Sequence, residues 1–156
     1  MEIRVADEKD LDGLMRLINQ AFAVERFFIT GDRLDPASTR EYFGKGTFLM
    51  AEEDGVLAAG VYVEMRGDRS YLGLLAVDPS RQKAGLGRRM VAAAEEFARE
   101  MGSHAMDMTV VNLRVNLPPF YRKLGYAEVG TAPIREEMMP RVTQACHFIR
   151  MSKALG

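Results

Sequence analysis

Residues 75–89 have the sequence LAVDPSRQKAGLGRR, and this stretch decides more about the fold than any other part of the chain. It starts inside the apolar run 71–77, which is typical of a strand buried on both faces of a sheet. After a short polar loop, apolar residues recur at helical spacing from Gly85 as far as Gly102. The stretch therefore predicts a buried strand, a glycine-containing loop and a helix in immediate succession.

The loop between this strand and helix has the composition of an anion-binding site. The first turn of a helix carries unpaired backbone N–H groups and the positive end of the helix dipole. Gly85 and Gly87 leave room for an anion to approach the backbone. Four cationic residues accompany them, namely Arg81, Lys83, Arg88 and Arg89. We expect a ligand with phosphate groups, although a glycine pair alone is equally typical of a tight turn with a solvated basic edge.

Outward from this stretch, hydrophobic periodicity predicts a mixed α/β chain. The spacings of the P-loop and of the dinucleotide fingerprint are both absent, so neither of these phosphate-binding motifs accounts for the glycine loop. Strands are predicted at residues 2–6, 47–52, 56–66, 71–77, 104–111, 126–130 and 146–151. Helices are predicted from residue 7 to 22, near Pro36, from 85 to 101, and from 118 to 123. The order β-α-(α)-β-β-β-α-β-α-β-β implies both antiparallel pairing and one helical crossover.

Length and composition narrow the function classes. The chain has 156 residues and no linker-like segment, so we expect a single domain over 1–156. With 21 Lys and Arg against 22 Asp and Glu, net charge gives no reason to expect nucleic-acid or membrane binding. Cys146 is the only cysteine, which excludes an internal disulfide and fits a reducing cytoplasm. The two histidines lack metal-ligand spacing, so no metal is predicted, and no targeting segment is visible.

Two motifs resemble those of the GNAT N-acetyltransferase superfamily. Residues 77–79 (VDP) followed by 82–87 (QKAGLG) resemble its acyl-CoA loop, (Arg/Gln)-x-x-Gly-x-(Gly/Ala), with all three fixed positions matched. Residues 120–126 (FYRKLGY) resemble its second signature, a short helix ending in Tyr-x-x-x-Gly-(Phe/Tyr). The motif-level resemblance covers residues 47–130. It implies a GNAT-like fold, a central mixed and mostly antiparallel sheet flanked by helices on both faces.

The resemblance also implies that acetyl-CoA is the co-substrate. Pantetheine would then lie beside the strand and bond to the backbone of Leu75, Ala76 and Val77. The pyrophosphate would be held by the loop residues Gln82, Lys83, Ala84, Gly85, Leu86, Gly87 and Arg88. Arg81 and Lys83 are candidates for the 3′-phosphate, or are simply solvated. Asn112 is matched to a cofactor-binding asparagine of the family, whose usual spacing would fall on Arg114; Asn116 is a candidate contact or a helix cap.

For catalysis, the resemblance implies that Tyr121 is the general acid that protonates the leaving thiolate. Core packing is the alternative for this tyrosine. The family often places a carboxylate or histidine base before the loop, but residues 70–73 contain no acid. Glu25, Glu64 and a chain of water molecules are candidates for the base, and none is assigned.

The acceptor side is predicted to come partly from residues 23–46. Glu25, Phe28, Arg33 and Glu64 are the candidate substrate contacts, with core packing equally suitable for the phenylalanine. The sequence is compatible with an amino acid, a peptide N-terminus, an aminoglycoside or another small amine as acceptor, and with acetyl or longer acyl groups. A non-catalytic CoA sensor and an α/β interaction domain without a nucleotide ligand are the alternative functions. The resemblance also allows a homodimer.

Overall fold

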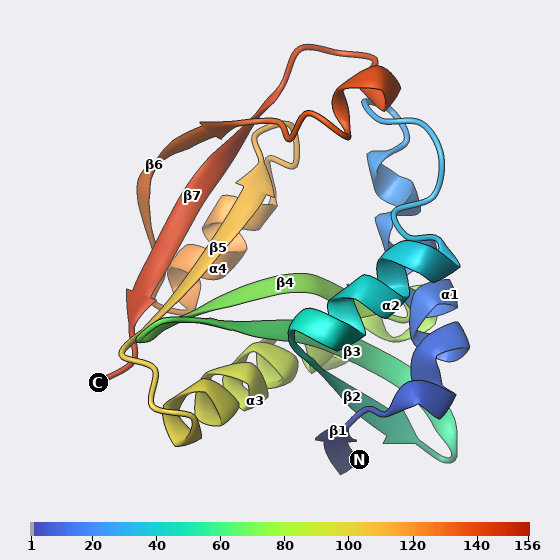
Figure 1. Ribbon diagram of the computed structural model, residues 1–156, viewed down its shortest axis with the longest axis vertical. Helices are drawn as coiled ribbons and strands as arrows, with labels where there is room; N and C mark the ends of the chain where they lie inside the picture. Colours follow the sequence, from blue (N-terminus) through green and yellow to red (C-terminus); the bar gives the residue numbers. More distant parts are fainter. Residues whose placement is uncertain (1) are drawn as a thin grey trace.

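Seven strands form one sheet in the computed structural model, which describes residues 2–156 apart from the side chains of residues 83 and 84. The spatial order is β1-β2-β3-β4-β5-β7-β6 (Figure 1), and β4–β5 is its one parallel pair. The strands are β1 (Glu2–Val5), β2 (Thr47–Glu53), β3 (Val56–Arg66), β4 (Arg69–Val77), β5 (Ala105–Val111), β6 (Ala127–Pro133) and β7 (His147–Ala154). The predicted order of elements and the mixed, mostly antiparallel α/β fold are therefore confirmed.

Helices cover both faces of the sheet (Figure 1). The α-helices are α1 (Leu11–Phe22), α2 (Pro36–Lys45), α3 (Leu86–Glu100) and α4 (Leu117–Lys123). Short 3₁₀ turns are η1 (Glu8–Asp10), η2 (Ala23–Glu25), η3 (Pro79–Ala84) and η4 (Met139–Arg141). One core cluster joins α3 and α4 to the sheet, and a second joins α1 to the opposite face. No helix of the described chain is long and apolar enough to span a bilayer.

The two central strands, β4 and β5, diverge along their length. They pair only from Arg69–Ala105 to Tyr71–Asp107, within the described chain. Beyond Tyr71, the β3–β4 register gains one extra residue on β4, and Leu74 has a left-handed backbone with φ of 52°. Leu72 packs on the α3 side of the sheet and Leu74 on the α1 side, so the bulge reverses the usual alternation. The strands consequently leave an opening between them.

The connection between β6 and β7 crosses over the top of this opening (Figure 1). Ile29 and Val142 form an isolated antiparallel bridge, and the Thr143 N–H donates to the Phe28 carbonyl at 2.8 Å. A third core cluster beneath this contact joins the segment after α1 to the ends of β5 and β7. The segment after α1 and the β6–β7 connection therefore make one continuous wall.

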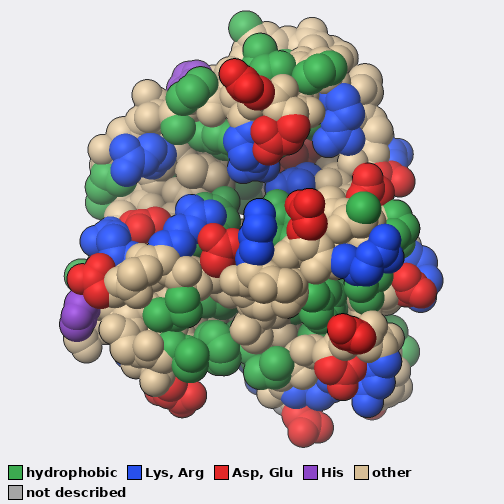
Figure 2. Space-filling view, in the orientation of Figure 1, with side chains coloured by type: hydrophobic (Ala, Val, Ile, Leu, Met, Phe, Trp, Pro, Cys, Tyr) green, Lys and Arg blue, Asp and Glu red, His purple; other side chains and the backbone are tan. Residues whose placement is uncertain are grey.

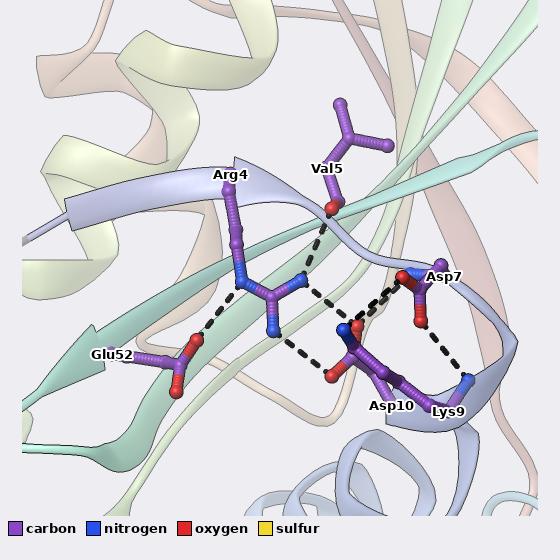
Figure 3. Close-up of polar contacts among 6 residues, drawn as sticks. All are labelled: Arg4, Val5, Asp7, Lys9, Asp10 and Glu52. Atoms are coloured by element: carbon purple, nitrogen blue, oxygen red, sulfur yellow. Dashed lines mark hydrogen bonds and ion pairs between the residues drawn. The ribbon is translucent and has the colours of Figure 1, made fainter.

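Edge strand β1 is fixed by an ionic clamp around Arg4 (Figure 3). The guanidinium donates to both carboxylate oxygens of Asp10, at 2.9 and 3.0 Å, and to Glu52 on β2 at 2.9 Å. Asp10 also accepts a hydrogen bond from the backbone N–H of Asp7 at 2.9 Å. Bidentate pairing of this kind has a defined geometry, so the clamp fixes the start of α1 relative to β1 and β2.

We predict that Asp10→Asn makes the protein less stable at neutral pH. The hydrogen bond from Arg4 lowers the pKa of Asp10, so ionised Asp10 stabilises the folded state. This stabilisation is present above the ordinary aspartate pKa of about 4 and is lost as the pH falls through the lowered value. The Tm difference between wild type and variant should therefore narrow below about pH 4. Asp12→Asn, at an exposed position on α1, is the control; an equal loss there would contradict the clamp.

Candidate functional site

The opening between β4 and β5 forms a cavity of about 740 Å³, here named the strand cavity. Its walls are residues 72–75 and Val77 of β4 and residues 108–111 of β5. Past Tyr71, β4 and β5 make no pairs with each other in the described chain, so backbone N–H and C=O groups at this edge are available to a ligand. A polar extended molecule could bond to this edge as an additional strand does.

One end of the strand cavity is formed by the glycine loop and the start of α3. Gly85 has φ of 74°, a conformation that favours glycine, and it separates η3 from α3. The N–H of Arg89 is the first to bond back along the helix, to the Gly85 carbonyl, so the first-turn N–H groups have no intrahelical acceptor. A Cβ at Gly87 would stand 3.4 Å from the Phe120 ring. The small residues therefore let a ligand reach the helix terminus.

The phenol of Tyr121 lies in the same cavity, on α4. Only 5% of this residue is exposed, and its ring packs against Phe120 and Tyr126 with centroids 5.0 and 5.9 Å away. No hydrogen bond joins its hydroxyl to a residue that the structure describes. Burial raises its pKa well above the ordinary value, despite the opposing charge of Arg114. Tyr121 therefore stays protonated at neutral pH and can donate that proton.

A buried ion pair closes the cavity on the side of η2. Glu25 is 7% exposed, and its carboxylate accepts a hydrogen bond from the Arg114 guanidinium at 2.8 Å. Burial raises the pKa of Glu25, although the charge of Arg114 opposes the shift. Arg114 follows β5 and comes from a part of the chain 89 residues away. The pair places a carboxylate of elevated pKa in the cavity that holds Tyr121.

A second cavity, of about 1000 Å³, meets the strand cavity at Thr109, which lines both. We name it the open cavity; Figure 2 shows a hollow on this face bordered by acidic and basic side chains. Glu64 accepts hydrogen bonds from the Tyr62 hydroxyl and from Arg66, both at 2.6 Å. Partial burial opposes ionisation of Glu64, but these two donors hold its pKa below the ordinary value. Glu64 is therefore a stable anion in this cavity.

Most of the residues predicted from the sequence lie in these two cavities. The strand cavity is lined by Leu75, Val77, Gln82, Gly85, Gly87, Arg88, Tyr121 and Glu25. The open cavity is lined by Arg33 and Glu64. The side chains of Ala76 and Leu86 are buried in the core, which leaves only their backbone for a ligand. The side chains of Lys83 and Ala84 are outside the described part of the chain.

Two predictions need correction. Phe28 is 1% exposed in the third core cluster, and its neighbour Phe27 lines the strand cavity instead. The Asn112 side chain accepts a hydrogen bond from the backbone of His147 at 2.9 Å, so it ties β5 to β7 and lines neither cavity. Arg81 is not simply solvated, since it pairs with Glu53 at 3.4 Å and with Asp78 at 3.7 Å; its contact with a phosphate stays a prediction.

Of the two roles expected for Asn116, a ligand contact or a helix cap, the structure favours the contact, because Asn116 lines the strand cavity and makes no capping hydrogen bond with its side chain. The sequence interpretation missed Arg114 as a site candidate. Arg114 stands where the usual family spacing expects an asparagine, and that departure was the available signal. Among residues 2–82 and 85–156, no three His, Cys, Asp or Glu side chains converge as metal ligands.

Comparison with known proteins gives one family match. The chain matches the acetyltransferase (GNAT) domain family over residues 19–154. A mycothiol acetyltransferase of Clavibacter sepedonicus is 28% identical over 124 residues, which are 78% of this chain and 41% of that protein. One from Propionibacterium freudenreichii is 24% identical over 131 residues, which are 80% of this chain and 42% of that protein. The chain therefore spans about two fifths of the length of these curated relatives.

Solved structures share the fold along nearly the whole chain. The ribosomal-protein-S18-alanine N-acetyltransferase of Escherichia coli has a TM-score of 0.79 at 18% identity, covering 99% of this chain and 94% of that one. An aminoglycoside 6′-N-acetyltransferase solved with coenzyme A has a TM-score of 0.78 at 20% identity. The match covers 100% of this chain and 98% of that one. A Salmonella typhimurium protein solved with its cofactor acetyl-CoA has a TM-score of 0.77 at 20% identity. The match covers 100% of this chain and 94% of that one. At these identities the likeness establishes the fold.

Proposed function

The chain belongs to the GNAT acetyltransferase domain family, and from that premise we propose that it transfers an acetyl group from acetyl-CoA to a primary amine. One observation carries the proposal: a single cavity joins the N-terminus of α3 to a buried tyrosine whose pKa is raised. Residues 1–156 would act as one acetyltransferase domain. The amine would attack directly while both substrates are bound, because the open cavity adjoins the strand cavity at Thr109.

The strand cavity suits the three parts of acetyl-CoA. The first-turn N–H groups of α3, next to Gly85 and Gly87, would bind the pyrophosphate. The free edge of β4 would bond to the amides of the pantetheine, with Leu75 and Val77 alongside. The thioester would then lie toward Tyr121. When bound, acetyl-CoA supplies the acyl group and a thiolate leaving group.

Tyr121 is the group that we assign as general acid. Its raised pKa keeps the proton on the phenol until the sulfur begins to carry negative charge. The hydroxyl has no hydrogen-bond partner among the described residues, so its proton is available to the sulfur. The neighbouring cation Arg114 favours the phenolate that remains after the transfer.

We predict that Tyr121→Phe lowers kcat by about a hundredfold or more, because the leaving thiolate loses its proton donor. The KM for acetyl-CoA should change little, since the ring and its packing are kept. Steady-state kinetics check this, with Tyr126→Phe as the control. Tyr126 is a buried tyrosine whose hydroxyl donates to Glu95 at 2.8 Å, away from the cavity lining. Full kcat in Tyr121→Phe would remove the acid assignment.

The attacking amine must first lose a proton, and Glu25 suits this role better than Glu64. An effective base has a pKa close to the working pH. Burial moves the pKa of Glu25 upward, while the donors around Glu64 move its pKa downward. Glu25 also lines the cavity that holds Tyr121. We therefore assign Glu25 to proton removal, directly or through water, and Glu64 to binding the ammonium group.

We predict that Glu25→Gln lowers kcat/KM and changes its dependence on pH. In the wild type, kcat/KM should fall as the pH drops through the raised pKa of Glu25, because the protonated acid cannot accept a proton. The variant should lose that acidic limb. Glu64→Gln should keep the limb and raise the KM for the amine. The opposite pattern, with the limb lost only in Glu64→Gln, would exchange the two roles.

The alternative is a CoA-binding sensor without turnover. The absence of an acid at residues 70–73 favours this alternative, and Ser70 there is in a hydrogen bond with Ser103. Glu25 supplies a carboxylate from another segment, and this supports the proposal that the protein is an enzyme. Acetyl-CoA binding without acetylation of any amine would favour the sensor.

A further inference from the structure

The open cavity has two arginines without a carboxylate partner in the described chain. Arg33 is half-buried, and its guanidinium donates to the Tyr42 hydroxyl at 3.3 Å. Arg141 is also half-buried, and it donates to the backbone carbonyl of Asp32 at 2.8 Å. The carboxylate of Asp32 is itself paired with Arg26 at 3.0 Å. The carboxylates of Asp32, Asp35, Glu41 and Glu137 also line this cavity, but in the described chain none of them lies within ion-pair distance of Arg33 or Arg141. Both guanidinium groups can therefore accept the anionic group of a ligand.

These two arginines lie in adjacent segments of one wall. Arg141 stands against Gly31, where a Cβ would meet its Nη1 at 3.1 Å, so it adjoins the loop that carries Arg33. The backbone holds this arrangement, because the Thr30 N–H donates to the Arg141 carbonyl at 2.9 Å. The two arginines are therefore brought together by the contact between the segment after α1 and the β6–β7 connection.

Glu64 is the carboxylate that β3 contributes to the open cavity. A chain of aromatic contacts connects it to the arginines: Arg33 bonds to Tyr42, the rings of Tyr42 and Tyr62 are 4.8 Å apart, and Tyr62 donates to Glu64. Arg66 also bonds to Glu64 and lies over the Tyr71 ring at 4.2 Å. Among the charged residues that line the cavity, Glu64 is thus connected to Arg33 and Arg141 through a wall of tyrosine rings.

We propose that the acceptor is a small amine that also carries an anionic group, with an α-amino acid carboxylate as the leading source and a phosphate as the other. The ammonium would be held at Glu64, and the anionic group at Arg33 and Arg141, where planar guanidinium groups match its oxygens. This inference rests on the proposed acetyl transfer. In that reaction the amine nitrogen bonds to the acetyl carbon, the C–S bond breaks, CoA leaves as the thiol, and one proton is released from the ammonium.

Matched pairs of acceptors test this directly. The common α-amino acids are assayed with acetyl-CoA as free acids and as methyl esters, and O-phosphoethanolamine is assayed against ethanolamine. Each pair keeps the amine and removes the anion. We expect at least one free acid or the phosphate to exceed its neutral partner in kcat/KM by about tenfold or more. The pair that shows the larger ratio identifies carboxylate or phosphate as the anion.

Variants then locate the effect in the cavity. Arg33→Met and Arg141→Met should each bring the ratio of anionic to neutral acceptor toward one. Arg40→Met, which removes a charge at an exposed position of α2 outside the cavity lining, should keep the wild-type ratio. Because the ratio is taken within one protein sample, partial misfolding of a variant cancels.

Calorimetric titration with acetyl-CoA separates the two hypotheses. Neutral acceptors used as well as anionic ones, or no acetylation of any anionic acceptor, would overturn the inference if acetyl-CoA still binds. Failure of the wild type to bind acetyl-CoA would overturn the proposed function itself.

Discussion

Hydrogen bonding between β4 and β5 ends after Tyr71, and both cavities owe their position to this break in the sheet. One extra residue on β4, with Leu74 in a left-handed conformation, turns the strand away from β5 after Tyr71. Such a conformation costs a non-glycine residue about 1 kcal/mol or more. Surrounding packing offsets it, since Leu74 is buried against the α1 side of the sheet. The divergence creates the strand cavity and aims it at the start of α3.

Burial of charge then distinguishes the two cavities. In the strand cavity, desolvation keeps Tyr121 protonated and raises the pKa of Glu25, which suits groups that move protons. In the open cavity, hydrogen bonds keep Glu64 ionised, and two arginines lack carboxylate partners in the described chain, which suits groups that hold charges. Proton transfer and acceptor recognition would thus be divided between adjoining spaces that share Thr109.

Local signals in the sequence predicted most of the fold and about half of the site. Apolar periodicity and turn residues predicted the strands and helices, and the glycine loop indicated the start of α3. These features depend on residues that are neighbours in the sequence. The errors came from contacts between distant segments. Phe28 rather than Phe27 is buried because residues from β5 and β7 surround it, and Arg114 was missed because it joins the site through Glu25, 89 residues away. Asn112 is bonded to β7, which no spacing rule reveals.

Calorimetric titration of acetyl-CoA into wild type and Gly87→Glu measures whether the strand cavity and the start of α3 bind the co-substrate. A glutamate at Gly87 would place a negative charge and added bulk beside Phe120, at the end of the cavity assigned to the phosphates. Gly44→Glu, on α2 where a Cβ meets nothing within 4 Å, is the matched control. We expect wild type and control to bind acetyl-CoA, with affinity in Gly87→Glu reduced by about tenfold or more. Equal binding by all three proteins, or no binding by the wild type, would contradict it.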